Sequence, residues 1–226
     1  MKNNACNLSF LKNMIHLFTY IFIALLCSSA MAKALQVKDQ FGNPIENVVV
    51  SYSTTGITTS DIVDVAIMDQ IDKQFSPQVL VVQKNQTVSF PNSDDIRHHL
   101  YSFSKPKPFE FRMFKGGESK NLKFDQTGIV VLGCNIHDQM VGYIYVADNE
   151  HTVMTNAQGI ANVPQGVLAI KLWHSGLSAN KVERKDVQLL PSPSTQPLAI
   201  MLTLLANIVV PTKNKFGSKK FGRGDH

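Results

Sequence analysis

The sequence predicts an all-β protein. Short apolar runs rich in β-branched residues recur along the chain, and clusters of Gly, Pro, Asn and Asp separate them. Between about Val63 and Leu132, no stretch shows the sustained 3.6-residue periodicity of an amphipathic helix. Many short strands at regular spacing indicate a β-sandwich or a barrel. The 226 residues are enough for one or two such domains with a sizeable core.

The first 32 residues are predicted to be a secretory signal peptide (1–32). Lys2 and Lys12 precede an apolar run at about 15–26, and the segment ends in the small-residue pattern Ala-Met-Ala, which finishes at Ala32. A retained membrane anchor is the alternative, but the run is short for a membrane span. We therefore expect export to the periplasm, cleavage after Ala32 or alternatively after Ala34, and no membrane span in the mature chain.

Cleavage leaves a single cysteine. Cys6 and Cys27 fall in the signal peptide, so the mature chain keeps only Cys134 and forms no internal disulfide. A lone thiol in an oxidising compartment is exposed to oxidation unless it is bound, and coordination to a metal ion would protect it.

The net charge of the chain gives little information about its binding partners. The signal holds two of the 22 Lys and Arg residues and none of the 17 acidic residues, so its removal lowers the formal net charge from +5 to +3. Much of the positive excess lies at 211–226, a Gly-rich, basic segment predicted to be a disordered tail. Nucleic acid is not an expected partner for an exported chain.

The strands are predicted in chain order from these patterns. A β-hairpin is expected within 33–60, where runs at 35–38 and 48–52 flank a Gly-Asn-Pro turn. From about Val63, further strands are expected at 78–82, 87–90, 96–103, 109–114, 122–124 and 129–132. After Val146 the pattern restarts, with strands expected at 155–164, 166–174, 187–190 and 198–205.

One loop carries the candidate metal ligands. It lies between apolar runs at 130–132 and 141–146 and contains Cys134, His137 and Met140. A thiolate, an imidazole and a thioether form a ligand set that suits copper, with methionine as a long axial ligand. Cysteine and methionine often simply pack in a core, but here they share a loop with polar residues. The pattern therefore favours metal binding.

A trigonal copper site needs a second histidine from elsewhere in the chain. His98 and His99 both lie in the predicted strand 96–103. Successive residues of a strand point to opposite faces, so only one of the two can point inward. Alternation places His99 on the face of Tyr101 and Phe103, which favours His99 if those aromatic residues face the core.

These residues resemble the cupredoxins, the small blue copper proteins. The Cys-x2-His-x2-Met spacing is similar to that of the amicyanin-like members, and the resemblance covers about 67–147. The runs at 75–82 and 87–90 look like the first strands of bacterial plastocyanin-like domains, and 142–146 looks like their last strand. The resemblance implies a cupredoxin Greek-key β-sandwich at 64–147 that holds one mononuclear type 1 copper site.

The resemblance also implies four copper ligands. They are a histidine on the middle strand, then Cys134, His137 and Met140. In the family an asparagine commonly precedes the first ligand by six residues, and Asn92 stands six residues before His98. On this spacing we favour His98 as the first ligand, although strand alternation favours His99.

The segments that flank the copper domain resemble a second family. Segments 33–60 and 150–206 look like parts of one small transthyretin-like or carboxypeptidase-regulatory-like β-sandwich, into which the copper domain is inserted. Cupredoxin sequences with such flanks are often labelled methylamine utilisation proteins. That label implies a pathway context and no substrate.

The function implied by the resemblance is one-electron transport between periplasmic redox proteins, such as a c-type cytochrome or an amine dehydrogenase. In the family the loop histidine lies nearest to solvent, so His137 is the expected electron portal, with Ile136, Met140 and Val141 as partner contacts. The alternatives are a copper carrier or delivery protein, and an adhesion or carbohydrate-binding module with a chance ligand set. An enzyme is not expected, because no catalytic motif is found and four protein ligands leave copper no open position.

Overall fold

The computed structural model describes residues 32–53, 65–190 and 196–205. All regular elements in these ranges are β-strands, so the predicted all-β class is confirmed. The predicted signal peptide, apart from Ala32, and the predicted basic tail lie outside the described residues. Within the described ranges, no helix is long and apolar enough to cross a membrane.

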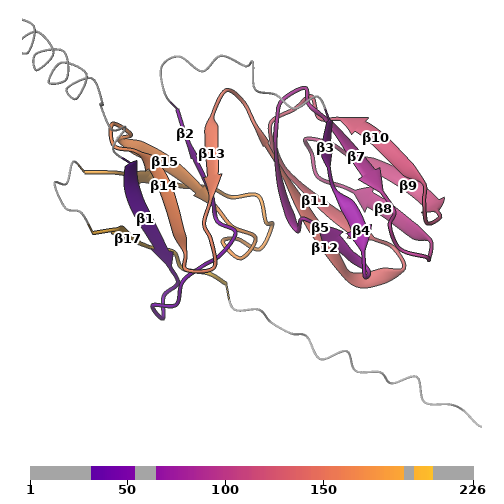
Figure 1. Ribbon diagram of the computed structural model, residues 1–226, viewed down its shortest axis with the longest axis horizontal. Helices are drawn as coiled ribbons and strands as arrows, with labels where there is room; N and C mark the ends of the chain where they lie inside the picture. The colour runs from indigo at the N-terminus through magenta and orange to yellow at the C-terminus, as the bar shows by residue number, and fades with distance from the viewer. Residues whose placement is uncertain (1–31, 54–64, 191–195, 206–226) are drawn as a thin grey trace, which may run out of the picture.

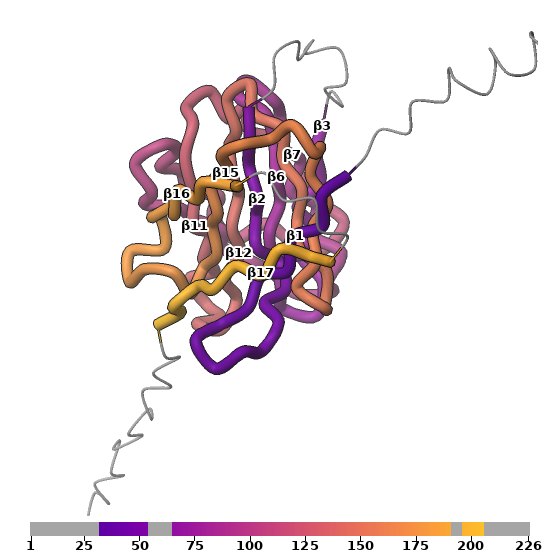
Figure 2. The backbone as a smooth tube through the Cα atoms, turned by 90° about the vertical axis from the view of Figure 1, so that its left-hand side faces the viewer, coloured from indigo at the N-terminus to yellow at the C-terminus, as the bar shows by residue number. Residues whose placement is uncertain are grey.

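The strands form four stacked layers (Figure 1). In spatial order, the first layer consists of β14 (Ile160–Pro164), β1 (Ala32–Lys38) and β17 (Leu198–Met201). The second layer consists of β13 (His151–Met154), β2 (Val49–Tyr52), β15 (Ala169–Trp173) and β16 (Lys185–Gln188). Figure 2 views the molecule from the side of the first layer, with β1 and β17 towards the viewer.

The third layer is the largest sheet. Its strands, in spatial order, are β6 (Val79–Gln83), β12 (His137–Ala147), β11 (Gly128–Cys134), β8 (His98–Ser102) and β9 (Phe109–Phe114). The fourth layer consists of β10 (Ser119–Lys123), β7 (Thr87–Pro91) and β3 (Val65–Ile67). A separate hairpin of β4 (Asp69–Ile71) and β5 (Gln74–Ser76) lies against β7 and β12.

Three hydrophobic clusters fill the spaces between the layers. The first lies between layers one and two and includes Leu35, Val50 and Leu172. The second lies between layers three and four and includes Phe90, Leu132 and Ile144. The third joins layers two and three and consists of Val49, Val79, Ile129, Tyr143, Tyr145, Ala147 and Trp173. Alternation along β2 and β12 lets each strand contribute to two clusters, one on each face.

The predicted hairpin at 33–60 is wrong, because β1 and β2 do not pair with each other. β1 pairs with β14 and β17, whereas β2 pairs with β13 and β15 in the next layer. The turn itself forms: Asp39 Oδ1 accepts hydrogen bonds from the backbone N–H groups of Phe41 and Asn43. The chain then crosses between layers. The continuous apolar run at 48–50 is typical of a fully buried strand, and all four residues of β2 are buried.

The third cluster joins the two β-sandwiches through buried aromatic residues. The fully buried ring of Trp173 meets Tyr143 and Tyr145 edge-on, at centroid distances of 5.5 and 6.2 Å. The Trp173 indole N–H donates to the carbonyl of Lys181 at 2.9 Å, and the Tyr145 hydroxyl donates to Ser51 Oγ at 3.0 Å. Large apolar rings with satisfied polar atoms are well suited to such a junction.

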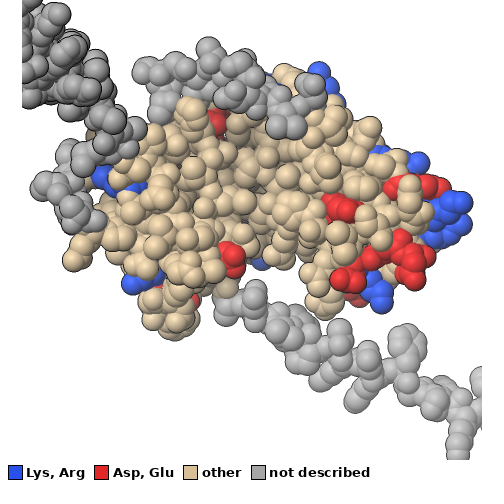
Figure 3. All heavy atoms as spheres, viewed as in Figure 1, with Lys and Arg blue, Asp and Glu red and all other residues tan. Residues whose placement is uncertain are grey.

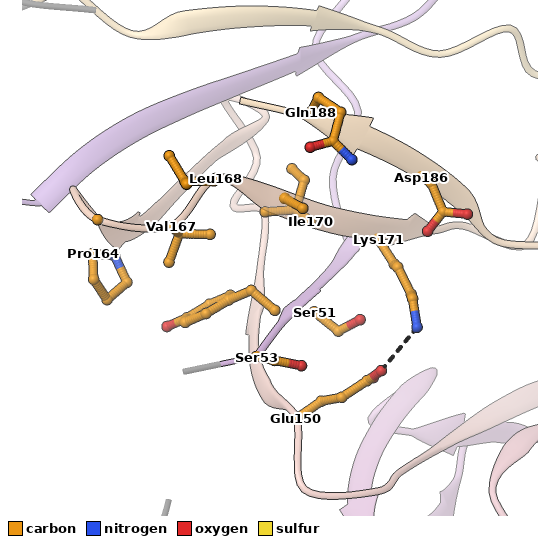
Figure 4. A pocket seen from close by; sticks show the side chains of 13 residues that line it. Ser51, Ser53, Glu150, Pro164, Val167, Leu168, Ile170, Lys171, Asp186 and Gln188 are labelled. Carbon is orange, nitrogen blue, oxygen red and sulfur yellow. Dashed lines mark hydrogen bonds and ion pairs between the residues drawn. The ribbon is translucent and has the colours of Figure 1, made fainter. Parts of the chain in front are cut away.

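A groove of about 640 Å³ opens on the second layer (Figure 4). Within it, Lys171 Nζ lies 3.3 Å from Glu150 Oε1. Glu150 Oε2 also lies 3.4 Å from the Tyr145 hydroxyl oxygen and 3.8 Å from Arg184 Nη1. Glu150 therefore connects β12 of the third layer to charged side chains of the second.

Charged side chains are distributed unevenly over the surface. In the view of Figure 3 they gather over the half of the molecule that contains layers three and four, and they are sparser over the other half. The two sandwiches thus present different surfaces to solvent on this face.

We expect Trp173→Ala to lower the free energy of unfolding by about 3–5 kcal/mol, because it leaves a cavity between the two sandwiches. Urea denaturation followed by far-UV circular dichroism measures the change. Phe41→Ala is the matched control, since Phe41 is an aromatic residue that is 80% exposed, and it should change stability by less than about 0.5 kcal/mol. Equal stability of the two variants would show that the third cluster does not couple the sandwiches.

Candidate metal centre

Three of the predicted ligands meet at one end of the third layer. His98 begins β8, Cys134 ends β11 and His137 begins β12, and β11 runs antiparallel to both neighbours. The ligand atoms of the three residues lie within 4.8 Å of one another. Cys134 Sγ is 3.7 Å from His98 Nδ1 and 3.5 Å from His137 Nδ1. The two imidazole rings have a centroid distance of 5.1 Å and an interplanar angle of 64°.

A register irregularity in the β11–β12 pair places these side chains. Gly133 pairs with Val141, but the next residue, Cys134, pairs with His137, so β12 has three extra residues at this point. The predicted loop is therefore a two-residue turn between strand ends. One of the extra residues, Met140, is 1% exposed and belongs to the same hydrophobic cluster as Cys134. Its burial makes it unavailable as a partner contact, so that part of the sequence prediction is wrong.

The structure brings His98, and not His99, to the cysteine. His98 is fully buried. His99 points away, and its Nε2 lies 2.7 Å from Glu110 Oε1. Alternation does separate the two histidines, but Phe103 is 86% exposed. The premise that Tyr101 and Phe103 face the core, which favoured His99, is therefore wrong for Phe103.

Asn92 shapes the loop that leads into β8. Its side-chain amide donates to the carbonyls of Ile96 and Phe114 at 2.8 and 3.2 Å, and its Oδ1 accepts from the backbone N–H of Asp94 at 3.1 Å. These bonds close the loop between Asn92 and His98. The six-residue spacing between Asn92 and His98 is thus explained by the hydrogen bonds that Asn92 makes within this loop.

Asp94 was not among the site residues predicted from the sequence. Its Oδ2 lies 2.7 Å from His98 Nε2, and its two oxygens accept the backbone N–H groups of Asp72 at 2.6 Å and Lys73 at 3.0 Å. Burial raises the pKa of Asp94, but the hydrogen bonds from Lys73, His98 and Asp72 outweigh it and hold the pKa below its ordinary value. The available signal was an acidic residue four positions before His98.

The donor atoms fit one first-row transition-metal ion. With a metal–sulfur distance of about 2.3 Å and a metal–nitrogen distance of about 2.0 Å, tetrahedral to trigonal angles place sulfur and nitrogen about 3.5 to 3.7 Å apart. The two observed distances are 3.5 and 3.7 Å. Among the described residues, no other Cys, His, Asp or Glu joins the group. Two imidazoles and a thiolate, with Met140 buried in the same cluster as Cys134, suit copper, whereas structural zinc usually has a fourth Cys, His or carboxylate.

Access to this site is one-sided. His98 and Cys134 are 0% and 4% exposed, whereas His137 is partly exposed. Ile136, in the turn between the two loop ligands, is 45% exposed. His137 is therefore the member of the group that is most exposed to solvent.

Comparisons with known proteins give partial matches. No protein-family model and no curated protein matches the chain. The solved structures that resemble it are cupredoxins. A copper-containing nitrite reductase from Thermus scotoductus SA-01 is 25% identical over 42% of this chain, with a TM-score of 0.36, and the chain spans 25% of its length. A reduced Cu(I) amicyanin variant at pH 4 is 17% identical over 43% of this chain and 98% of its own, with a TM-score of 0.35. At such scores the likeness carries no weight for the site, whose assignment depends on its own geometry.

We expect His98→Ala to weaken copper binding by more than about 100-fold, beyond the 10- to 100-fold effect typical of residues that support a ligand. His99→Ala should leave the affinity close to that of the wild type, because His99 faces Glu110. Competition titrations with a copper chelator measure both, and circular dichroism checks that both variants fold. The opposite ranking would mean that His98 is not the ligand.

Proposed function

We propose that the protein is an exported, non-enzymatic copper protein that carries single electrons between periplasmic redox partners. His98, Cys134, His137 and Met140 would hold one type 1 copper ion. The observation that carries the proposal is the position of Cys134 Sγ, 3.7 and 3.5 Å from the Nδ1 atoms of two histidines in a largely buried site.

The copper ion, when bound, supplies reversible one-electron chemistry between its two common oxidation states. Cys134 provides a soft thiolate, which favours Cu(I), while imidazole suits both states. His98 and His137 would bind the ion together with the sulfur, and the buried apolar cluster that contains Cys134 and Met140 limits the access of water. The three ligands are held at the ends of three paired strands. Such a site needs little rearrangement between oxidation states.

The partly exposed edge of His137 would be the electron portal. Ile136 offers an exposed apolar side chain beside it, and Val141 is partly buried. A small apolar surface of this kind suits brief contacts with a redox protein such as a c-type cytochrome or an amine dehydrogenase. An amine dehydrogenase would match the methylamine utilisation context that the sequence resemblance implies.

We also propose that the copper domain, 64–147, is inserted into one discontinuous sandwich built from 33–60 and 150–206. Strand pairing supports this division. The first and second layers contain only strands from 32–52 and 151–201, while the third and fourth contain only strands from 65–147.

We expect the copper-loaded, oxidised protein to show an intense thiolate-to-copper absorption band in the visible range, because the sulfur of Cys134 is a direct ligand. Cys134→Ser should abolish the band and keep the far-UV circular dichroism of the wild type. A band that survives in the variant, or a wild type that binds copper without one, would overturn the type 1 assignment.

Electron carriage and copper delivery predict different behaviour of one sample. We expect fast, reversible electron exchange with a c-type cytochrome, measured by stopped flow, and slow copper loss to a competing chelator. Copper loss should be slow because two of the three clustered ligands, His98 and Cys134, are almost inaccessible to a chelator. Slow exchange together with rapid copper loss would instead identify a delivery protein.

A further inference from the structure

We propose that Asp94 is a positioning residue for the metal centre: its carboxylate holds the His98 ring in the orientation and tautomer that present Nδ1 to the metal. This inference rests on the proposed function, in which His98 binds copper. It assigns a role to a residue that lies outside the Cys-x2-His-x2-Met motif and is not itself a ligand.

The two nitrogens of His98 face different partners. Nε2 lies 2.7 Å from Asp94 Oδ2, while Nδ1 lies 3.7 Å from Cys134 Sγ. An ionised carboxylate only accepts hydrogen bonds, so Nε2 must carry the proton that it donates. In the neutral imidazole this leaves the lone pair on Nδ1, the nitrogen that faces the sulfur. Asp94 thus selects the metal-binding tautomer.

The carboxylate is itself held in place by a tight turn. Residues 72 and 73 connect β4 to β5, and the backbone N–H groups of Asp72 and Lys73 both donate to Asp94. Their φ angles are +53° and +59°, the left-handed conformation that a two-residue type I′ hairpin requires at both positions. Non-glycine residues rarely adopt it. The turn therefore aims two donors at one carboxylate and leaves the remaining acceptor capacity for His98.

The backbone of Asp94 is fixed as well. Its N–H donates to Oδ1 of Asn92 at 3.1 Å. The side chain of His98 is 0% exposed and that of Asp94 is 11% exposed, so little water competes for the bond between them. The donors of the turn and of His98 orient the Asp94 side chain, and the bond from its own backbone N–H to Asn92 holds the main chain from which that side chain extends.

Other acidic residues near the loop are placed differently. Asp69 Oδ2 accepts a hydrogen bond from Ser93 Oγ at 2.7 Å, and Asp69 Oδ1 accepts the N–H of Gln70 at 2.7 Å. Asp95, the next residue in the chain, is exposed. Asp95 is therefore a matched control: it has the same side chain, one position away, without the contact to His98.

Carboxylates that bond the outer nitrogen of a ligating histidine fix its ring and raise its basicity, and their loss typically costs 10- to 100-fold in metal affinity. Asp94→Ala should therefore weaken copper binding by about 10- to 100-fold. Asp94→Asn keeps the size and an acceptor oxygen but removes the charge, and we expect a loss near about tenfold, the lower end of that range. Asp95→Ala and Asp95→Asn should bind copper as the wild type does.

The experiment uses the full mature chain and two readouts. Chelator competition measures copper affinity, and ¹⁵N–¹H NMR of the copper-free protein tests for a slowly exchanging Nε2–H proton on His98. We expect this proton in the wild type and in both Asp95 variants, and we expect its signal to weaken or vanish in the Asp94 variants. A role confined to folding would lower thermal stability without changing the tautomer or the affinity of the folded fraction.

The outcomes separate this inference from the proposed function. If the wild type binds copper and Asp94→Asn matches Asp95→Asn in affinity and NMR signature, the positioning role is overturned and the copper assignment stands. If the wild type binds no copper, both fail. If Asp94→Ala does not fold, the pair of asparagine variants decides the question.

Discussion

The metal centre depends on the pairing of Cys134 with both of its neighbouring strands. Cys134 ends the central strand β11, and it pairs with Leu100 of β8 on one side and with His137 of β12 on the other. This pairing brings His98 and His137 to the sulfur from opposite sides. The three extra residues on β12 also depend on it, because the ladder resumes only at Val141. A shift of one residue in either pair would turn a ligand to the opposite face of the sheet.

A buried thiol between two imidazoles is costly unless each polar atom has a partner, since an unsatisfied buried donor or acceptor costs about 1–3 kcal/mol. Both nitrogens of His98 are accounted for, by Asp94 on one side and by Cys134 on the other. The apolar cluster behind the site, which includes Phe114 and Met140, supplies the packing that offsets the remaining cost. The donors that would hold a metal ion therefore lie among partners supplied by the protein itself.

The sequence predicted the local features and missed the long-range ones. Strand positions and the Cys-His-Met spacing follow from short-range patterns, and the Asn92 spacing led to the histidine that the structure places at the cysteine. The pairing of β1 and β2 could not be read from their turn, because the burial of β2 on both faces is decided by distant layers. Asp94 was missed because the β4–β5 turn that holds it is remote in sequence. Met140 was expected both as a copper ligand and as a partner contact, and the second role fails because the residue is buried beside the register irregularity on β12.

Strand β12 connects the metal centre to the rest of the molecule. Its first residue is His137, and further along its side chains alternate between two clusters, with Ile144 facing the core between layers three and four and Tyr145 facing Trp173 of the second layer. Without the first two layers, the third layer would expose Tyr143 and Tyr145 on one sheet face, a contiguous apolar patch of the kind that favours association. The flanking sandwich covers that face. It therefore supports the sheet that carries the ligands, whatever partner it also contacts, and the two sandwiches are best understood as one structural unit around β12.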